Sequence, residues 1–208
     1  MYEVYTWGTP NGFKPLIMLE ELGLPYDLRK IDLGKGEQKR PDYLALNPNG
    51  KIPTLVDERD GERITIFESA AILIYLAEET GRLLPTEKEP RFTVLEWLMF
   101  QIGAIGPTFG QFGAFSRAEP KVQPAIDKFR VECERLAGVL DGHLAGREWL
   151  GEDYSIADIA TFPWIRAADF VGLQLSGAPN LTAWMNRVGD RPAVRRALAL
   201  FPPPRRPS

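Results

Sequence analysis

Hydrophobic and polar residues follow two different periods in the first part of the chain. Residues 3–7 read Glu-Val-Tyr-Thr-Trp, a β-branched and aromatic composition that is typical of a strand. Apolar residues then recur at helical spacing from Phe13 to Leu22, and Gly23 supplies a helix stop. A second strand is predicted over Tyr26–Leu33. This order of elements predicts a right-handed, parallel strand–helix–strand unit.

Two more strands and a buried helix complete this first part. The strand pattern resumes at Lys51–Val56 and again at Arg63–Phe67, with a hairpin turn around Asp60-Gly61 between them. The helix predicted over Ser69–Thr80 is apolar on most sides, and a helix of this kind is buried on two faces. It is therefore expected to lie between the sheet and another layer.

The remainder of the chain predicts helices only. Apolar residues recur at helical spacing at Phe92, Leu95, Met99, Ile102, Ile105, Ile126, Phe129, Cys133, Leu136 and Leu140. Ser155 and Asp158 have the spacing of a helix capping box. We therefore expect an α/β domain at 1–80, a linker at 81–88, an all-helical domain at 89–201 and a disordered, proline-rich tail at 202–208.

Composition excludes several classes of protein. The chain has 208 residues, a formal net charge of -3 and 44% hydrophobic residues, which is ordinary for a globular protein and gives no attraction for nucleic acid. No apolar run approaches the ~20 residues of a membrane helix, and the chain opens into a strand without a signal-peptide pattern. The single cysteine, Cys133, excludes an internal disulfide and a paired-cysteine metal motif. We expect a cytoplasmic protein without metal, nucleic-acid or membrane partners.

Candidate chemistry gathers around Ile52-Pro53 and Glu68-Ser69. A cis proline at the entrance of a strand would leave the backbone N–H and C=O of Ile52 free to pair with an extended peptide. Glu68-Ser69 opens the next helix, whose free N–H groups suit a carboxylate, while the Glu68 side chain suits an amine. Together the two stretches predict a site for a short peptide with an α-amino acid group at one end.

Several segments make the chain similar to the cytosolic glutathione transferases. The strongest points of resemblance are Asn49-Gly50-Lys51-Ile52-Pro53, Phe67-Glu68-Ser69-Ala70-Ala71-Ile72 and the cap at Ser155–Asp158. Three further segments resemble the nu class, which is known for glutathione-dependent disulfide-bond reductase activity: Thr9–Lys14, Asp32–Gln38 and Gly103–Gln111. The resemblance covers nearly all of the chain except the tail. It implies an α/β thioredoxin-like N-terminal domain plus an all-α C-terminal helical domain, in a homodimer that takes glutathione as co-substrate.

The resemblance also implies how the two candidate stretches would contact glutathione. Glu68 and Ser69 would hold the γ-glutamyl amino acid group, and Ile52 would pair main chain to main chain with the cysteinyl residue beside a cis Pro53. From the residues alone, a simple helix start is the favoured explanation of Glu68-Ser69, and most X–Pro bonds are trans. The motif favours the functional interpretation at both places.

Two further polar residues are implied to contact glutathione, and others are expected to have no part in the site. Gln38 and Lys51 would reach the glycyl end of glutathione, where Lys51 is a natural partner for the carboxylate. Lys35 and Lys39, in the same loop region as Gln38, are expected to be plain solvated residues. Cys133 lies on an apolar helical stripe, so we expect a small core residue without a redox role.

Thr9 and Asn11 would face the sulfur of glutathione. Most transferases of this fold place a tyrosine, serine or cysteine there, and this departure suits the nu class. The Thr9 hydroxyl, the Asn11 amide and the free N–H groups of a helix start would each stabilise a thiolate. Without the resemblance, both residues would be assigned to a turn. The implied reaction is attack of the bound thiolate on a small disulfide or an electrophile, with a second glutathione resolving the mixed disulfide.

Two other functions fit the same residues. One is a conjugating glutathione transferase with a specific electrophile, and the other is a non-catalytic, glutathione-binding regulatory module. The glycine-rich stretch from Phe100 to Phe115 is likewise open to two interpretations: a helix broken for close packing, or small residues that leave room for a second substrate.

Overall fold

The computed structural model describes residues 1–59, 61–175 and 177–202. They form two compact units, one of Met1–Arg82 with the segment that begins at Asp190, and one of Leu83–Gly189. Asp60 of the predicted hairpin turn and residues 203–208 of the predicted tail lie outside the described residues. Over the described ranges, no helix is both long and apolar enough to cross a membrane.

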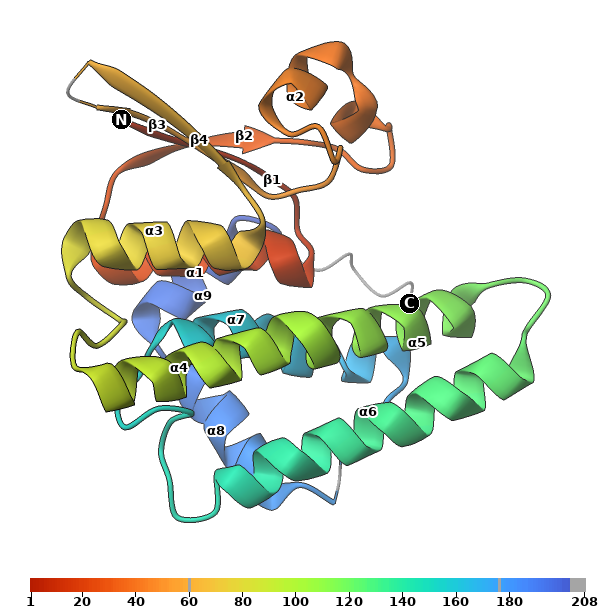
Figure 1. Ribbon diagram of the computed structural model, residues 1–208. Coiled ribbons are helices and arrows are strands. Elements are labelled where there is room, and N and C mark those ends of the chain that lie inside the picture. The colour runs from red at the N-terminus through yellow and green to blue at the C-terminus, as the bar shows by residue number, and fades with distance from the viewer. Residues whose placement is uncertain (60, 176, 203–208) are drawn as a thin grey trace. The chain divides into compact units, whose positions relative to one another are not determined.

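The first unit is built on a four-stranded sheet in the order β2-β1-β3-β4 (Figure 1). The strands are β1 Tyr2–Thr6, β2 Tyr26–Lys30, β3 Thr54–Arg59 and β4 Glu62–Phe67. β1 and β2 are parallel, which confirms the predicted unit, and the two other pairings are antiparallel. β3 begins later than predicted, at Thr54, because Pro53 has no N–H to donate to a neighbouring strand.

Helices cover both faces of this sheet. α1 (Pro10–Leu22) and α3 (Ser69–Thr80) lie on one face, and α2 (Pro41–Leu46), which follows a 3-10 turn at Glu37–Lys39, lies on the other (Figure 1). α3 has the predicted bounds, and its residues Ile72, Leu73 and Leu76 are fully buried. The apolar core of the unit therefore lies between the sheet and the α1–α3 pair.

The last helix, α9 (Pro192–Ala199), also belongs to the first unit, where it packs on α1. The predicted boundaries placed it in the helical domain because it follows the other helices in the sequence. Val194 and Ala197 are buried, and the Arg191 Nε atom lies 2.6 Å from Glu21 Oε1 of α1. α9 therefore belongs to the first unit because it packs against α1, although it follows the helices of the second unit in the sequence.

α1 begins at Pro10, earlier than the Phe13 start that the sequence predicts. Thr9 has an extended backbone, and its Oγ1 accepts a hydrogen bond from the Gly12 N–H at 3.2 Å. Pro10 fits the first helical position because no N–H is needed there. Gly23, at φ 69°, ends the helix as predicted. The predicted turn at residues 9–12 is therefore a capped helix start.

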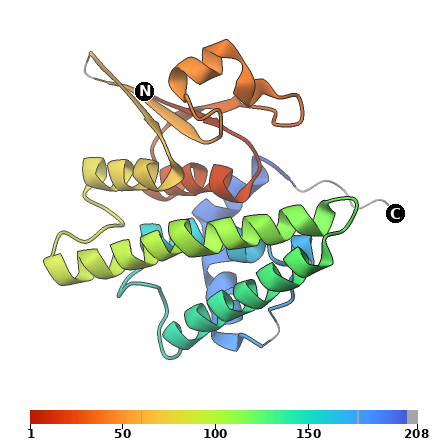
Figure 2. The same cartoon turned by 45° about the vertical axis from the view of Figure 1, so that its right-hand side comes forward.

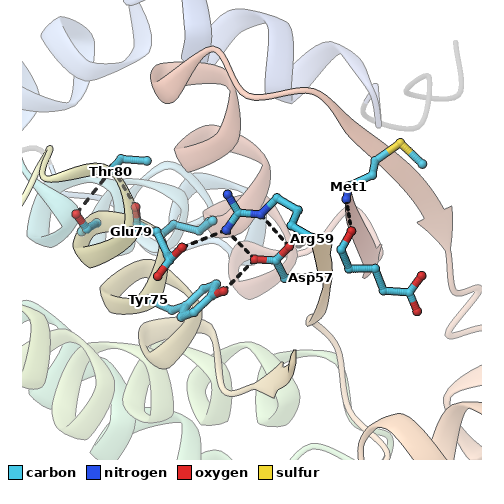
Figure 3. Close-up of polar contacts among 9 residues, drawn as sticks. Met1, Asp57, Arg59, Tyr75, Glu79 and Thr80 are labelled. Carbon is cyan, nitrogen blue, oxygen red and sulfur yellow. Dashed lines mark hydrogen bonds and ion pairs between the residues drawn. The ribbon is translucent and has the colours of Figure 1, made fainter. Parts of the chain in front are cut away.

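A charged cluster joins α3 to β3 (Figure 3). Arg59 donates hydrogen bonds to Asp57 at 2.7 and 2.6 Å and to Glu79 of α3 at 2.9 Å. The Tyr75 hydroxyl, also on α3, donates to Asp57 at 2.6 Å. The Arg59 guanidinium holds the pKa of Asp57 below its ordinary value. These contacts hold the second half of α3 against the sheet.

The second unit consists of helices over the residues that the structure describes, as predicted. They are α4 Lys88–Phe100, a π-helical turn at Gln101–Ile105, α5 Gly106–Arg117, α6 Gln123–His143, α7 Ile156–Arg166, a 3-10 turn at Asp169–Val171 and α8 Pro179–Gly189. α5 and α6 lie side by side in both views (Figures 1 and 2). Cys133 is fully buried on α6, and burial raises its pKa to about 12, which confirms the expected core residue.

The predicted capping box opens α7. The Asp158 carboxylate accepts hydrogen bonds from the Ser155 N–H at 3.0 Å and from the Leu150 N–H at 3.0 Å. It also accepts one from the Trp184 indole of α8 at 2.8 Å. Asp158 and Trp184 are both fully buried. One carboxylate therefore ties the start of α7 to the preceding loop and to α8.

The glycine-rich stretch supports close packing at two of its positions. A Cβ atom at Gly106 would lie 2.9 Å from Gln101 Nε2, and one at Gly113 would lie 3.0 Å from Val171 Cγ1. A Cβ atom at Gly103 would meet nothing within 4 Å. Gly106 and Gly113 therefore let α5 approach Gln101 and Val171 closely, and Gly103 has no such role.

Candidate functional site

The predicted site residues come from four segments of the first unit. They are Thr9 and Asn11 at the start of α1, Gln38 in the 3-10 turn, Lys51–Pro53 before β3, and Glu68-Ser69 at the start of α3. The pairing of β3 with β4 places Thr54 opposite Phe67. The residue after Pro53 is therefore a neighbour of the residue before Glu68, and the two stretches that the sequence singles out lie together.

The segment before β3 contains a residue, Ile52, whose backbone N–H and C=O are not paired with the described residues. The bond between Ile52 and Pro53 is cis, as predicted. The carbonyl of Lys51 accepts hydrogen bonds from the Tyr43 hydroxyl and from the Asn47 amide, both at 2.7 Å. Among the described residues, none makes a hydrogen bond with the backbone N–H or C=O of Ile52. That backbone is available to pair with an extended peptide.

Glu68 has an unusual backbone at the start of α3. Its φ is 72° and its ψ 116°, a left-handed conformation that costs a residue other than glycine about 1–3 kcal/mol. Its side chain does not cap the helix and is exposed to solvent. The first N–H groups of α3 therefore have no acceptor within the helix, and the Glu68 carboxylate stands beside them. The positive end of the helix suits a carboxylate on a ligand, and the Glu68 carboxylate suits an amine on the same ligand.

The strain at Glu68 gives a stability prediction. We expect Glu68→Gly to have a free energy of unfolding about 1 kcal/mol above that of Glu68→Ala, because glycine adopts this φ without steric cost. Chemical denaturation of the two variants measures the difference. The alanine variant is the matched control, since it removes the carboxylate and keeps the strain. Equal stability of the two variants would contradict a strained backbone at this position.

Thr9 and Asn11 make the start of α1 a site for an anion. Both side chains are half-buried. The Thr9 oxygen accepts from the Gly12 N–H, so the hydroxyl hydrogen remains to be donated. Asn11 is the second residue of the helix, where the positive end of the helix dipole is strongest. A thiolate placed here would meet a hydroxyl, an amide and the helix end.

Gln38 has an unsatisfied side-chain oxygen. Its Oε1 atom is shielded from solvent and has no hydrogen-bond partner among the residues that the structure describes. The Gln38 carbonyl would lie 3.1 Å from a Cβ atom at Gly50, so this turn adjoins the loop that carries Lys51. A buried acceptor without a donor is unfavourable, and an amide N–H of a peptide ligand would satisfy it.

The sequence did not assign a role to Lys14, which the structure adds to this site. The residue is fully buried, and its Nζ atom lies 3.2 Å from Ser69 Oγ. Burial lowers its pKa to about 7, and the nearby Glu68 carboxylate opposes this shift. A signal exists in the sequence, because Lys14 interrupts an otherwise apolar run from Phe13 to Leu19.

A pocket on the α2 side of the sheet is lined by none of the predicted site residues. Its volume is about 410 Å³, and its walls include Tyr5, Tyr43, Arg40 and Asp42. Arg40 is paired with Asp42 at 2.9 Å, so these two charges satisfy each other. Within the described ranges, no group of three histidine, cysteine, aspartate or glutamate residues is placed to hold a metal ion. The candidate site therefore remains the one formed by the starts of α1 and α3.

Two family models match the chain: the N-terminal domain of glutathione S-transferase over residues 9–79, and its C-terminal domain over residues 123–187. The disulfide-bond oxidoreductase YfcG of Escherichia coli is 45% identical, over 95% of this chain and 94% of its own. A glutathione transferase from Pseudomonas putida, solved with one glutathione disulfide per subunit, has a TM-score of 0.89 and 42% identity over 95% of this chain and 90% of that one. A family member from Pseudomonas fluorescens, solved with two glutathione molecules bound, has a TM-score of 0.89 and 43% identity over 95% of this chain and 92% of that one.

Proposed function

The chain belongs to the glutathione S-transferase family, and we propose that it is a glutathione-dependent disulfide-bond reductase. The observation that carries this proposal is the start of α1, where Thr9 and Asn11 stand in place of a tyrosine, serine or cysteine. The one cysteine of the chain, Cys133, is buried in the other unit. No protein thiol is therefore placed to exchange with a disulfide, and the attacking sulfur must come from glutathione.

The residues of the site fit the chemical groups of glutathione. The amides at the start of α3, with Ser69, suit the γ-glutamyl carboxylate, and Glu68 suits the amine beside it. The backbone of Ile52 would pair with the cysteinyl residue beside Pro53. At the glycyl end, Lys51 would pair with the carboxylate. The unsatisfied acceptor of the Gln38 side chain supports an amide of the ligand nearby.

The reaction would proceed by two exchanges of thiol and disulfide. The glutathione thiolate attacks one sulfur of a small disulfide, the sulfur–sulfur bond breaks, and the other sulfur leaves as a thiolate that takes a proton from solvent. A second glutathione thiolate attacks the mixed disulfide and releases the remaining thiol. Two glutathione molecules supply the two electrons and leave as glutathione disulfide. Thr9 and Asn11 would favour the first thiolate over the thiol, whose ordinary pKa is about 8.5.

The class, the cellular location and the oligomeric state of the protein are part of the same proposal. The Thr9–Lys14 segment supports placement in the nu class, and we infer a cytoplasmic, homodimeric enzyme whose conjugation of electrophiles would contribute to detoxification. Ile64 and Phe67 of the first unit, and Phe92 and Met99 of the second, are exposed apolar side chains available for a subunit contact. Light scattering would test the dimer, with an expected mass of twice 23.4 kDa.

The function itself is tested by two assays run side by side. One measures glutathione-dependent reduction of hydroxyethyl disulfide, coupled to glutathione reductase, and the other measures conjugation of a chlorodinitrobenzene. We expect efficient reduction and poor conjugation. The opposite ranking would make the protein a conjugating transferase. If glutathione bound and neither reaction turned over, the protein would be a regulatory glutathione-binding module.

A further inference from the structure

A fully buried lysine stands directly behind the proposed glutathione site. Lys14 lies on α1 among buried apolar neighbours such as Phe13, Leu16 and Ile17. A buried ammonium group is costly unless it is paired, because desolvation disfavours the charge. Packing alone would be served better by an apolar side chain of the same length. A role for the amine itself is therefore indicated.

The amine is directed at the start of α3. Its Nζ atom lies 3.2 Å from the hydroxyl of Ser69, the first residue of that helix, and Ser69 is itself buried. Ser69 is the residue that would meet the γ-glutamyl carboxylate of glutathione. Lys14 therefore contacts the residue that would meet the carboxylate.

The elements packed against α1 differ in the charged groups that they place near Lys14. From α3, the Glu68 carboxylate interacts with the amine. α9 packs on α1 as well, but its Arg196 is paired with Glu20 near the other end of α1. From β1, Thr6 donates its hydroxyl to the Gly12 carbonyl and does not titrate. Among the residues that the structure describes, Glu68 at the start of α3 supplies the charge that acts on the amine, so a charged ligand bound there would act on it too.

We propose that Lys14 is a positioning residue that holds Ser69 and takes up a proton when the carboxylate of glutathione binds at the start of α3. This inference rests on the proposed function. In the free protein, burial brings the pKa of Lys14 to about 7, so the amine is mostly neutral above that pH. A carboxylate nearby favours the ammonium form and raises the pKa again. Binding would therefore consume a proton above pH 7, and affinity would fall as the pH rises.

The test is calorimetric titration with S-methylglutathione, which has no thiol to titrate. Measured near pH 8 in buffers that differ in ionisation enthalpy, the binding heat of the wild-type protein should reveal uptake of close to one proton. The dissociation constant should rise by up to about tenfold per pH unit between about pH 7.5 and 8.5, because one proton is linked to binding. Lys14→Met should lose the proton uptake and the pH dependence, and bind at least about tenfold more weakly.

Two further variants separate charge from other effects. Lys35→Met is the matched control, because Lys35 is an exposed loop lysine that pairs with Asp32 at 3.5 Å, and it should behave like the wild type. Ser69→Ala should weaken binding and retain the proton uptake, since Lys14 remains. Wild-type binding without proton uptake, or the same uptake in Lys14→Met, would overturn the role of Lys14 and leave the proposed function standing. Failure of the wild-type protein to bind S-methylglutathione would overturn both.

Discussion

The double variant Thr9→Ala, Asn11→Ala is expected to reduce disulfide turnover at saturating glutathione by about 100-fold. A hydrogen bond to a charged group contributes about 1.5–3 kcal/mol, and every 1.36 kcal/mol is one pKa unit of the thiol. Loss of both donors should therefore raise the pKa of the bound thiol by at least about two units. Turnover should recover as the pH is raised, because thiolate then forms without help. Rates of hydroxyethyl disulfide reduction between about pH 6 and 9.5 would measure both effects.

Thr9 also caps α1, so its replacement has a structural effect that must be separated. Loss of such a cap typically costs about 1 kcal/mol of stability, which is small for a folded domain. Thr9→Ser keeps both the cap and the hydroxyl and serves as the control, with expected rates close to wild type. Unchanged turnover in the double variant, with an unchanged pH profile, would show that these two residues do not act on the sulfur.

Asp158→Ala is expected to lower the free energy of unfolding by about 4 kcal/mol, since it removes a buried carboxylate and leaves its donors unpaired. The donors are the N–H groups of Leu150 and Ser155 and the indole of Trp184. For a chain of this length, that loss corresponds to a melting temperature lower by about 10 °C. Urea unfolding followed by tryptophan fluorescence would measure it.

Asp153→Ala is the matched control for this stability prediction. Asp153 lies in the same loop as Ser155 and is exposed to solvent. Surface substitutions of this kind usually change stability by less than about 0.5 kcal/mol. A loss below about 1 kcal/mol in Asp158→Ala would mean that the unpaired donors find water or other acceptors, and that the capping box contributes little.

Local patterns were sufficient to predict much of the fold. α3 was predicted with its observed bounds because Glu68-Ser69 and Gly81 mark its two ends. The three-residue spacing of Ser155 and Asp158 predicted the capping box for the same reason. The cis bond before Pro53 is different, since it followed from the surrounding motif and not from composition. Where geometry depends on neighbours in sequence, the prediction was close to the structure.

Features that depend on distant contacts were not predicted. Lys14 interrupts an apolar run in the sequence, but its partner is not evident until α3, which begins 55 residues later, places Ser69 beside it. The backbone of Glu68 is a second example, because no residue type signals a φ of 72° outside glycine. α9 is a third, since its partner Glu21 lies 170 residues earlier in the chain. Such contacts depend on how the whole chain folds, and local sequence patterns do not predict them.

The return of α9 to the first unit has a consequence for synthesis of the chain. A ribosome that has reached Gly189 has made every strand of the sheet, yet the helix that covers α1 has still to be translated. Domains generally fold as they emerge, the N-terminal one first. Here the unit that begins first is the last to be completed, and Leu83–Gly189 can fold before it. Until α9 has been made, the nascent protein therefore carries an uncovered apolar face on α1, the kind of surface to which chaperones bind.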